Sequence, residues 1–180
     1  DSLENLLSQS KEDTNKVIHL CKISDAYWRI GSYDSCLALA NDALKLSLKL
    51  SPVFKKGEAS AYNKIGNFYY AQSNFHEAIK NYGYSLKIYE TMDSKKDIAS
   101  SYNNIGNIYY VQGNYPEALK MFFSCLKTAE KIGNKKLELT CYSNIGNVYY
   151  AQGNYPEALK NIFASLEIAK ALGDKAAEGT

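Results

Sequence analysis

The chain has 180 residues, of which 46% are hydrophobic and 22% are charged, so it suits one compact domain or one short repeat array. Its formal net charge of +2 is too small to indicate nucleic acid or an anionic membrane as a partner. No apolar run approaches the roughly 20 residues that a bilayer requires, so membrane insertion is not expected.

The first predicted element is an N-terminal capping segment over residues 1–16. Leu3, Leu6 and Leu7 recur there at helical spacing, which predicts a short helix. We expect this helix to cover the apolar face of the element that follows, because arrays of repeated units need such caps.

Internal repetition dominates the rest of the chain. The tripeptide Ile-Gly-Asn begins at Ile65, Ile105 and Ile145, at intervals of 40 residues. A weaker copy lies upstream, where Tyr27-x-x-x-Gly-Ser-Tyr corresponds to Tyr69-x-x-x-Ser-Asn-Phe. The predicted units are a divergent first unit at 17–58, followed by 59–98, 99–138 and 139–178, and residues 179–180 would open a fifth.

Each unit is predicted to form two helices, and the third unit shows the pattern clearly. Apolar residues and glycine between Tyr102 and Tyr109 share one helical face. Gly113 is expected to end that helix in a left-handed conformation. Asn114-x-x-Glu117 then has the spacing of a capping box, which predicts the start of the second helix.

Other glycines mark helix ends and helix contacts. Gly133 and Gly173 are predicted to end the second helices of the third and fourth units. Three further glycines lie inside the first helices, where each costs about 1 kcal/mol relative to alanine. This cost predicts a close approach of the second helix at small residues; the glycines are Gly66, Gly106 and Gly146, and the small residues are Ala78, Ala118 and Ala158.

The pattern aromatic-x-x-Ile-Gly-x-x-Tyr, followed by Gly-Asn-Tyr-x-Glu-Ala, resembles the tetratricopeptide repeat over residues 17–178. The resemblance implies an all-α fold, a right-handed superhelix (TPR solenoid) of about four helical hairpins. The usual unit of that family has 34 residues, so the period of 40 resembles a longer variety. The run 103–120 is also similar to TPR arrays that precede output domains in bacterial signalling proteins.

The last unit shows no polar cap in the sequence. We therefore expect Ile162, Phe163 and Leu166 to be partly exposed on the last helix. The parent protein is predicted to continue with further repeats or an output domain, and this end of the array is predicted to support homo-oligomerisation.

Stacked units of this kind coil so that their first helices line a concave surface. Residues at positions i, i+4 and i+7 of those helices are predicted to face the groove. The predicted partner-binding residues are Lys22, Asp25, Trp28 and Arg29 in the first unit, Asn63, Asn67 and Tyr70 in the second, Asn103, Asn107 and Tyr110 in the third, and Asn147 and Tyr150 in the fourth.

Two interpretations of this set stay open. Asparagine amides both donate and accept hydrogen bonds, so a ladder of them can bind the backbone of an extended peptide or a helix. Tyrosine would add rigid contact area with a polar tip. Alternatively, the asparagines pair with each other and with water, and the tyrosines pack between the units.

Two cysteines leave a second alternative open. Cys125 and Cys141 lie eight residues on either side of Gly133, so they are expected at the same level of adjacent antiparallel helices. They are interpreted either as small buried core residues or, in an oxidising compartment, as a disulfide. The chain opens at Asp1 rather than at methionine, so both the cytoplasm and the periplasm remain open.

The sequence contains no constellation of catalytic groups, phosphate-binding loop or metal-ligand motif. We therefore expect no enzyme activity, cofactor or metal. The main hypothesis is a protein–protein interaction module that binds a peptide or protein partner in the groove. The alternative is a sensory or regulatory domain that controls an output domain of a bacterial signalling protein.

Overall fold

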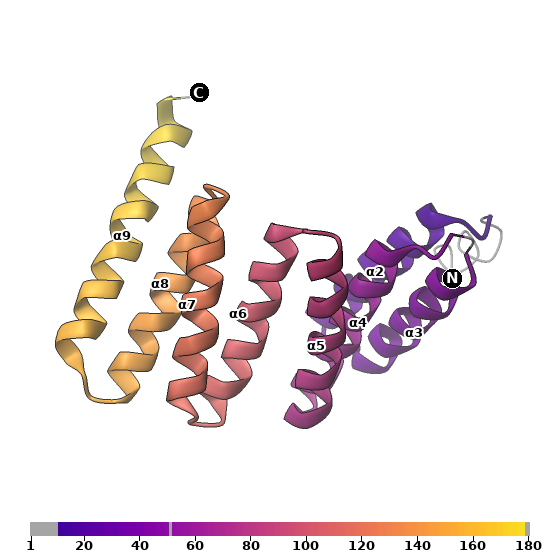
Figure 1. Ribbon diagram of the computed structural model, residues 1–180, viewed down its shortest axis with the longest axis horizontal. Coiled ribbons are helices and arrows are strands. Elements are labelled where there is room, and N and C mark those ends of the chain that lie inside the picture. The colour runs from indigo at the N-terminus through magenta and orange to yellow at the C-terminus, as the bar shows by residue number, and fades with distance from the viewer. Residues whose placement is uncertain (1–10, 51, 179–180) are drawn as a thin grey trace. The chain divides into compact units, whose positions relative to one another are not determined.

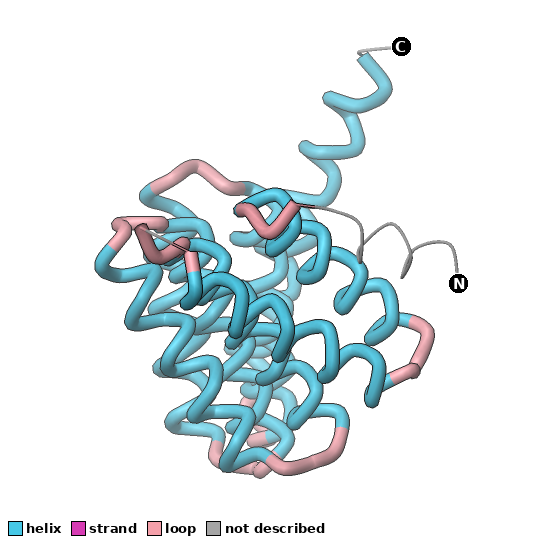
Figure 2. Tube along the Cα trace, turned by 90° about the vertical axis from the view of Figure 1, so that its right-hand side faces the viewer, coloured by secondary structure: helices cyan, strands magenta, loops and turns pink. Residues whose placement is uncertain are grey.

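The computed structural model describes residues 11–50 and 52–178. The predicted capping helix around Leu3, Leu6 and Leu7 and the opening of a fifth unit at 179–180 lie outside these residues. The described part of the chain consists of helices and short loops, with no strand (Figure 2). The helices are α2 (Thr14–Arg29), α3 (Tyr33–Lys49), α4 (Lys55–Ala71), α5 (Phe75–Thr91), α6 (Lys95–Val111), α7 (Tyr115–Lys131), α8 (Lys135–Ala151) and α9 (Tyr155–Glu178).

Consecutive helices pair into hairpins, so the predicted all-α fold of helical hairpins is confirmed (Figure 1). The chain divides into two compact units, with the boundary between Met92 and Asp93. Unit 1 contains the hairpins α2–α3 and α4–α5, and unit 2 contains α6–α7 and α8–α9. The predicted repeat borders after residues 58, 98 and 138 fall inside α4, α6 and α8, about one turn after each helix begins.

The turns inside the hairpins follow from backbone chemistry. Gly113 has a φ of +72°, the left-handed conformation predicted for it. The backbone N–H of Asn114 donates to the Tyr109 carbonyl at 2.8 Å, which is the long-range bond of a Schellman motif. Ser73 holds the equivalent place in the hairpin α4–α5 with a φ of +57°. The same turn therefore forms there without glycine.

The capping box predicted at Asn114 and Glu117 is wrong. The Asn114 side chain makes no capping hydrogen bond, and the Glu117 carboxylate pairs with Lys120 at 3.4 Å. The physical reason is that the Schellman bond already uses the Asn114 N–H, so no donor is left for the glutamate. At the start of α5 only one of the two capping-box hydrogen bonds forms: Asn74 Oδ1 accepts from the Glu77 N–H at 3.3 Å.

The glycines inside the first helices are packed against the second helix, as predicted, but the predicted small residue is among the nearest atoms only at Gly146, where the Ala158 carbonyl oxygen would lie 3.3 Å from an added Cβ. A Cβ atom at Gly66 would lie 2.6 Å from the Tyr82 ring, and one at Gly106 would lie 2.7 Å from the Phe122 ring. At Gly146 the nearest atom would be Ile162 Cγ1, at 2.8 Å. The small residues predicted for this role lie one turn earlier, so each glycine instead makes room for the large side chain that follows.

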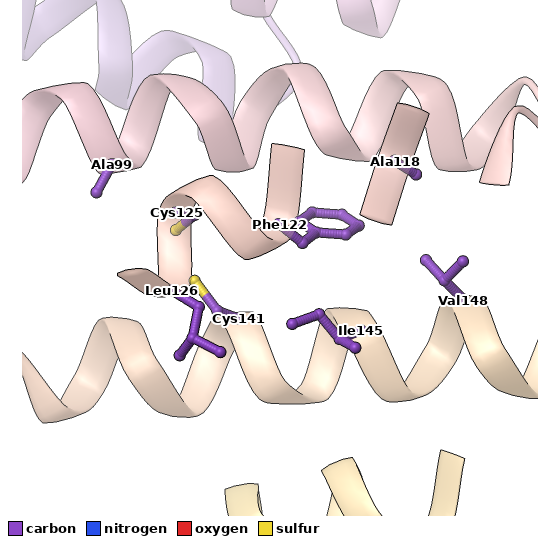
Figure 3. Packing of buried hydrophobic residues seen from close by; sticks show 8 residues of the cluster. All are labelled: Ala99, Ala118, Phe122, Cys125, Leu126, Cys141, Ile145 and Val148. Atoms are coloured by element: carbon purple, nitrogen blue, oxygen red, sulfur yellow. The ribbon is translucent and has the colours of Figure 1, made fainter. Parts of the chain in front are cut away.

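The core of unit 2 lies between α6, α7 and α8 (Figure 3). Phe122, Ile145 and Val148 are almost fully buried in it. Cys125 and Cys141 are also buried, both as free thiols, and Figure 3 shows their sulfur atoms side by side. A hydrogen bond with Cys125, together with burial, raises the pKa of Cys141 well above its usual range, so this thiol stays protonated.

The last helix departs from its predicted end. α9 continues through Gly173 to Glu178, because a single glycine only weakens a helix and the residues after it are good helix formers. Ile162, Phe163 and Leu166 are 42%, 60% and 47% exposed, which confirms their predicted exposure. Among the described residues, no helix has the length and apolarity that crossing a membrane would require.

Candidate functional site

An ion-pair network joins the first helices of unit 1. Asp25 of α2 accepts from Lys64 of α4 through Oδ1 at 2.7 Å, and its Oδ2 lies 3.0 Å from Arg29. The Lys64 side chain is only 18% exposed, so the pair with Asp25 is shielded from solvent more than a surface pair would be. Asp25 and Arg29, both predicted to bind a partner, pair with each other, and Asp25 also pairs with Lys64. The Arg29 side chain is 73% exposed.

Trp28 and Asn67 are similarly engaged inside unit 1. The Trp28 indole Nε1 donates to the Asn67 backbone carbonyl at 3.3 Å. The Tyr82 hydroxyl of α5 donates to Asn67 Oδ1 at 2.8 Å. Burial raises the pKa of Tyr82 well above its usual range, so its hydroxyl remains a donor at neutral pH. The Asn67 side chain therefore contributes to the hairpin, and its oxygen is already paired.

The remaining predicted residues of unit 1 are less constrained. Lys22 is exposed on α2, and Asn63 is half-buried on α4. Tyr70 at the end of α4 packs against Phe75 at the start of α5, with ring centroids 6.2 Å apart. This ring pair lies inside one hairpin, across its turn.

In unit 2 the first helices α6 and α8 contact each other through asparagines. Asn144 Nδ2 donates to Asn103 Oδ1 at 2.8 Å. Ser143, beside Asn144, pairs with Ser165 of α9 at 2.7 Å. The prediction that the asparagines pair with one another is therefore right for Asn103.

Asn107 of α6 and Asn147 of α8 differ from their counterpart Asn67. The positions that correspond to Tyr82 hold Phe122 and Ile162, and neither side chain can donate a hydrogen bond. No described residue makes a hydrogen bond to either amide. Asn107 is half-buried and Asn147 is exposed, so both amides can bond an external group.

Exposed tyrosines accompany these two amides. Tyr110 is 36% exposed and Tyr150 is 64% exposed, three residues after Asn107 and Asn147 on the same helices. Each ring pairs with the tyrosine that opens the next helix, Tyr115 at 6.2 Å and Tyr155 at 5.7 Å between centroids. These pairs hold the rings in place without burying them.

We call Asn103, Asn107, Tyr110, Asn147 and Tyr150 the α6/α8 face. It offers the unpaired amides of Asn107 and Asn147 beside two exposed aromatic rings, a combination suited to binding polypeptide. Sequence reasoning missed Lys64 and Asn144, the two residues that pair with Asp25 and Asn103. Lys64 directly follows the predicted residue Asn63, which was the available signal for it. The described residues contain no group of side chains able to hold a metal ion.

Comparisons with known proteins bear on the fold. A family model described as tetratricopeptide repeat matches residues 97–176, and a second model of the same description matches residues 59–92. Together the two matches cover more than half of the chain. No curated protein matches it.

Solved structures share the fold. A Rap protein complexed with competence and sporulation factor has a TM-score of 0.86 at 19% identity, covering 96% of this chain and 48% of that one. The Rap conjugation gene regulator of a plasmid, in complex with a Phr peptide, gives 0.73 at 18% identity, covering 84% and 42%. A signal transduction ATPase with numerous domains and a tetratricopeptide repeat sensor, from Pyrococcus horikoshii, gives 0.82 at 19% identity, covering 97% and 27%. The chain thus spans less than half of each, and identities this low establish the fold alone.

Proposed function

Because the chain belongs to the tetratricopeptide repeat family, we propose that it is a protein–protein interaction module that binds a peptide or protein partner. The partner lies along the α6/α8 face. The observation that carries the proposal is that the amides of Asn107 and Asn147 have no hydrogen-bond partner among the described residues. A repeat fold by itself assigns no function, so the proposal depends on this face.

The chemistry of the face suits an extended polypeptide. Each free amide offers one acceptor and two donor hydrogens, which match the N–H and C=O groups of a peptide backbone in any sequence. Tyr110 and Tyr150 supply rigid contact area at low conformational cost, because neighbouring rings already hold them. Two structural neighbours, both Rap proteins, are complexes with a sporulation factor and a Phr peptide.

Affinity selection from a displayed library of random peptides tests the proposal. Enriched peptides are synthesised and titrated by calorimetry into the native chain and into the double variant Asn107→Ala, Asn147→Ala. We expect affinity to fall by about tenfold or more in the variant, because each net hydrogen bond contributes about 0.5–1.5 kcal/mol.

Asn41→Ala, at an exposed asparagine of α3, is the matched control and should bind like the native chain. Circular dichroism verifies that all the variants are folded. Peptides that bind the double variant as tightly as the native chain would contradict the proposal, and so would a library that yields no amide-dependent peptide.

One observation favours a second candidate, a sensory or regulatory domain that controls an output domain. The Pyrococcus horikoshii neighbour is a signal transduction protein in which the tetratricopeptide repeat is the sensor. In that case peptide binding would change the arrangement of the helices. Hydrogen exchange measured with and without an enriched peptide separates the two: protection confined to α6 and α8 fits simple docking, and changes spread over both units fit a sensor.

A further inference from the structure

A pocket of about 550 Å³ lies in unit 2, away from the α6/α8 face. The end of α7 and the start of α8 form one side of it, and the second half of α9 forms the other. Its volume lies within the range of small-molecule and side-chain pockets in proteins. The proposed function does not use this pocket.

The pocket wall contains a buried carboxylate that is only half paired. Glu138 is 3% exposed. Its Oε2 atom accepts from Lys135 at 2.7 Å, and its Oε1 atom is buried with no hydrogen-bond partner among the described residues. A buried acceptor without a donor destabilises the folded state, because it has lost its water and gained nothing in return. Oε1 has almost no accessible surface, so a donor in the pocket completes the arrangement when the Glu138 side chain turns Oε1 toward it.

The third unit shows that the fold does not require this carboxylate. The residue that corresponds to Glu138 in the third unit is Ile98, which is 8% exposed. An apolar side chain therefore fits the same place in the same kind of hairpin. In the second unit the corresponding residue is Glu58, which is 9% exposed and accepts from Lys55 at 3.0 Å, so the lysine–glutamate pair recurs there.

The second unit shows how such a pocket closes. There the Tyr84 ring packs on Tyr62, with centroids 5.2 Å apart. The residues that correspond to this pair in the fourth unit are Ala164 and Tyr142, and both line the pocket. Alanine at position 164 thus leaves open the space that a tyrosine fills in the hairpin α4–α5.

The lining has the chemistry of a site for a cation on an apolar stem. Glu130, Glu138 and Glu167 contribute three carboxylates, and the single lysine among the lining residues already pairs with Glu138. The α9 side of the pocket adds alanine, isoleucine and leucine side chains, against which an alkyl chain can pack. The Tyr142 ring offers a face for a cation.

From this arrangement we infer that the pocket binds the side chain of an arginine that a partner polypeptide presents. The planar guanidinium donates to Glu138 Oε1 and has further N–H groups for the neighbouring carboxylates, which a lysine ammonium on its flexible stem matches less well. The alkyl stem lies against the α9 side chains. The inference rests on a site separate from the α6/α8 face, and its test does not depend on those asparagines.

The first experiment titrates capped arginine, Nα-acetylarginine amide, into the chain and follows backbone amide shifts by NMR. We expect shifts at the start of α8 and in α9, and at least about tenfold weaker binding of the citrulline analogue, which has the same shape without the charge. Equal binding of the two compounds overturns the inference. Free arginine that binds more tightly than the capped form points to an amino-acid ligand and also overturns it.

Variants then test the named residues. Glu138→Gln and Ala164→Tyr are each expected to weaken capped-arginine binding at least about tenfold, the first by removing charge and the second by filling space. Glu117→Gln is the matched control, because Glu117 is also a carboxylate paired with a lysine three residues on, and it should bind normally.

Glu138→Ile separates a binding role from a structural one. Because isoleucine is native at the equivalent position 98, this variant should fold, lose arginine binding, and melt at the native temperature or roughly 2–4 °C above it. A lower melting temperature together with retained arginine binding would show that Glu138 serves the fold, and it would overturn the inference.

Discussion

At the scale of single residues, one hydroxyl group distinguishes otherwise similar repeats. Tyr82 donates to Asn67, whereas Phe122 and Ile162 leave Asn107 and Asn147 without that donor. The same Ile-Gly-Asn tripeptide thus has a structural asparagine in the second unit and available amides in the third and fourth. The role of each asparagine is decided by a residue 15 positions later, on the partner helix.

Tyr82→Phe is expected to lower the free energy of unfolding at pH 7 by about 1 kcal/mol, because Asn67 loses its bonded donor. Burial raises the folded-state pKa of Tyr82, so its contribution is present below the unfolded pKa of about 10 and is lost as pH rises above that value. Above pH 10 the free energy of unfolding should therefore fall less steeply with pH in the variant than in the native chain. The difference between the two slopes is up to about 1.4 kcal/mol per pH unit.

Urea unfolding followed by circular dichroism between pH 7 and pH 11 measures both effects. Tyr155→Phe, at a ring that is 58% exposed, should leave stability at pH 7 unchanged. The free energy of unfolding of Tyr82→Phe could instead fall above pH 10 as steeply as that of the native chain. That result would show that the Tyr82 hydroxyl ionises as easily in the folded state as in the unfolded state.

At the scale of the helical hairpin, two glycines on facing helices should respond oppositely to the same change. A Cβ at Gly66 in α4 would lie 2.6 Å from the buried Tyr82 ring, whereas a Cβ at Gly83 in α5 would meet nothing within 4 Å. Gly83→Ala should raise the free energy of unfolding by about 1 kcal/mol through helix propensity. Gly66→Ala should lower it by about 1 kcal/mol, because overpacking costs about 1–3 kcal/mol and outweighs the same gain.

Chemical denaturation of the two single variants tests this pair, and each serves as the control for the other. If both substitutions raised the free energy of unfolding, α4 and α5 could move apart with little loss of stability. The close approach at Gly66 would then not constrain the fold.

At the scale of the whole molecule, the outer side of α9 predicts self-association. Phe163 is 60% exposed, and Ile162 and Leu166 beside it are also exposed, which makes an apolar strip on one helix. We expect sedimentation equilibrium to show a weight-average mass that rises with concentration and exceeds the 20.1 kDa of one chain. Phe163→Glu should restore a monomer, because burying an unpaired carboxylate in such a contact is costly.

Lys127→Glu introduces a glutamate at an exposed site on α7, with a larger change in net charge, and should associate like the native chain. A native chain that remains monomeric at every concentration tested would refute self-association through this strip.

The repeat, the helical hairpins and most helix ends could be predicted from the sequence, because period, glycine placement and apolar spacing are local properties of the chain. The exposed residues of α9 and the position of Cys125 and Cys141 at the same level of adjacent helices were also predicted correctly. Sequence reasoning misplaced the end of α9, the capping of α7 and the residues packed on the helix glycines, since each depends on which group already holds a neighbouring hydrogen bond or space.

Which polar residues are available for a partner depends on contacts between helices and could not be predicted from the sequence. Asp25, Trp28 and Asn67 are engaged with residues of other helices, whereas Asn107 and Asn147 are not. The missing hydrogen-bond partner of Glu138 Oε1 is likewise a property of the folded structure, in which Glu138 lines a pocket with residues of α9. The physical reason is that a side chain's periodic position says which face it occupies, but its hydrogen-bond partners come from other helices, and those partners vary from one repeat to the next.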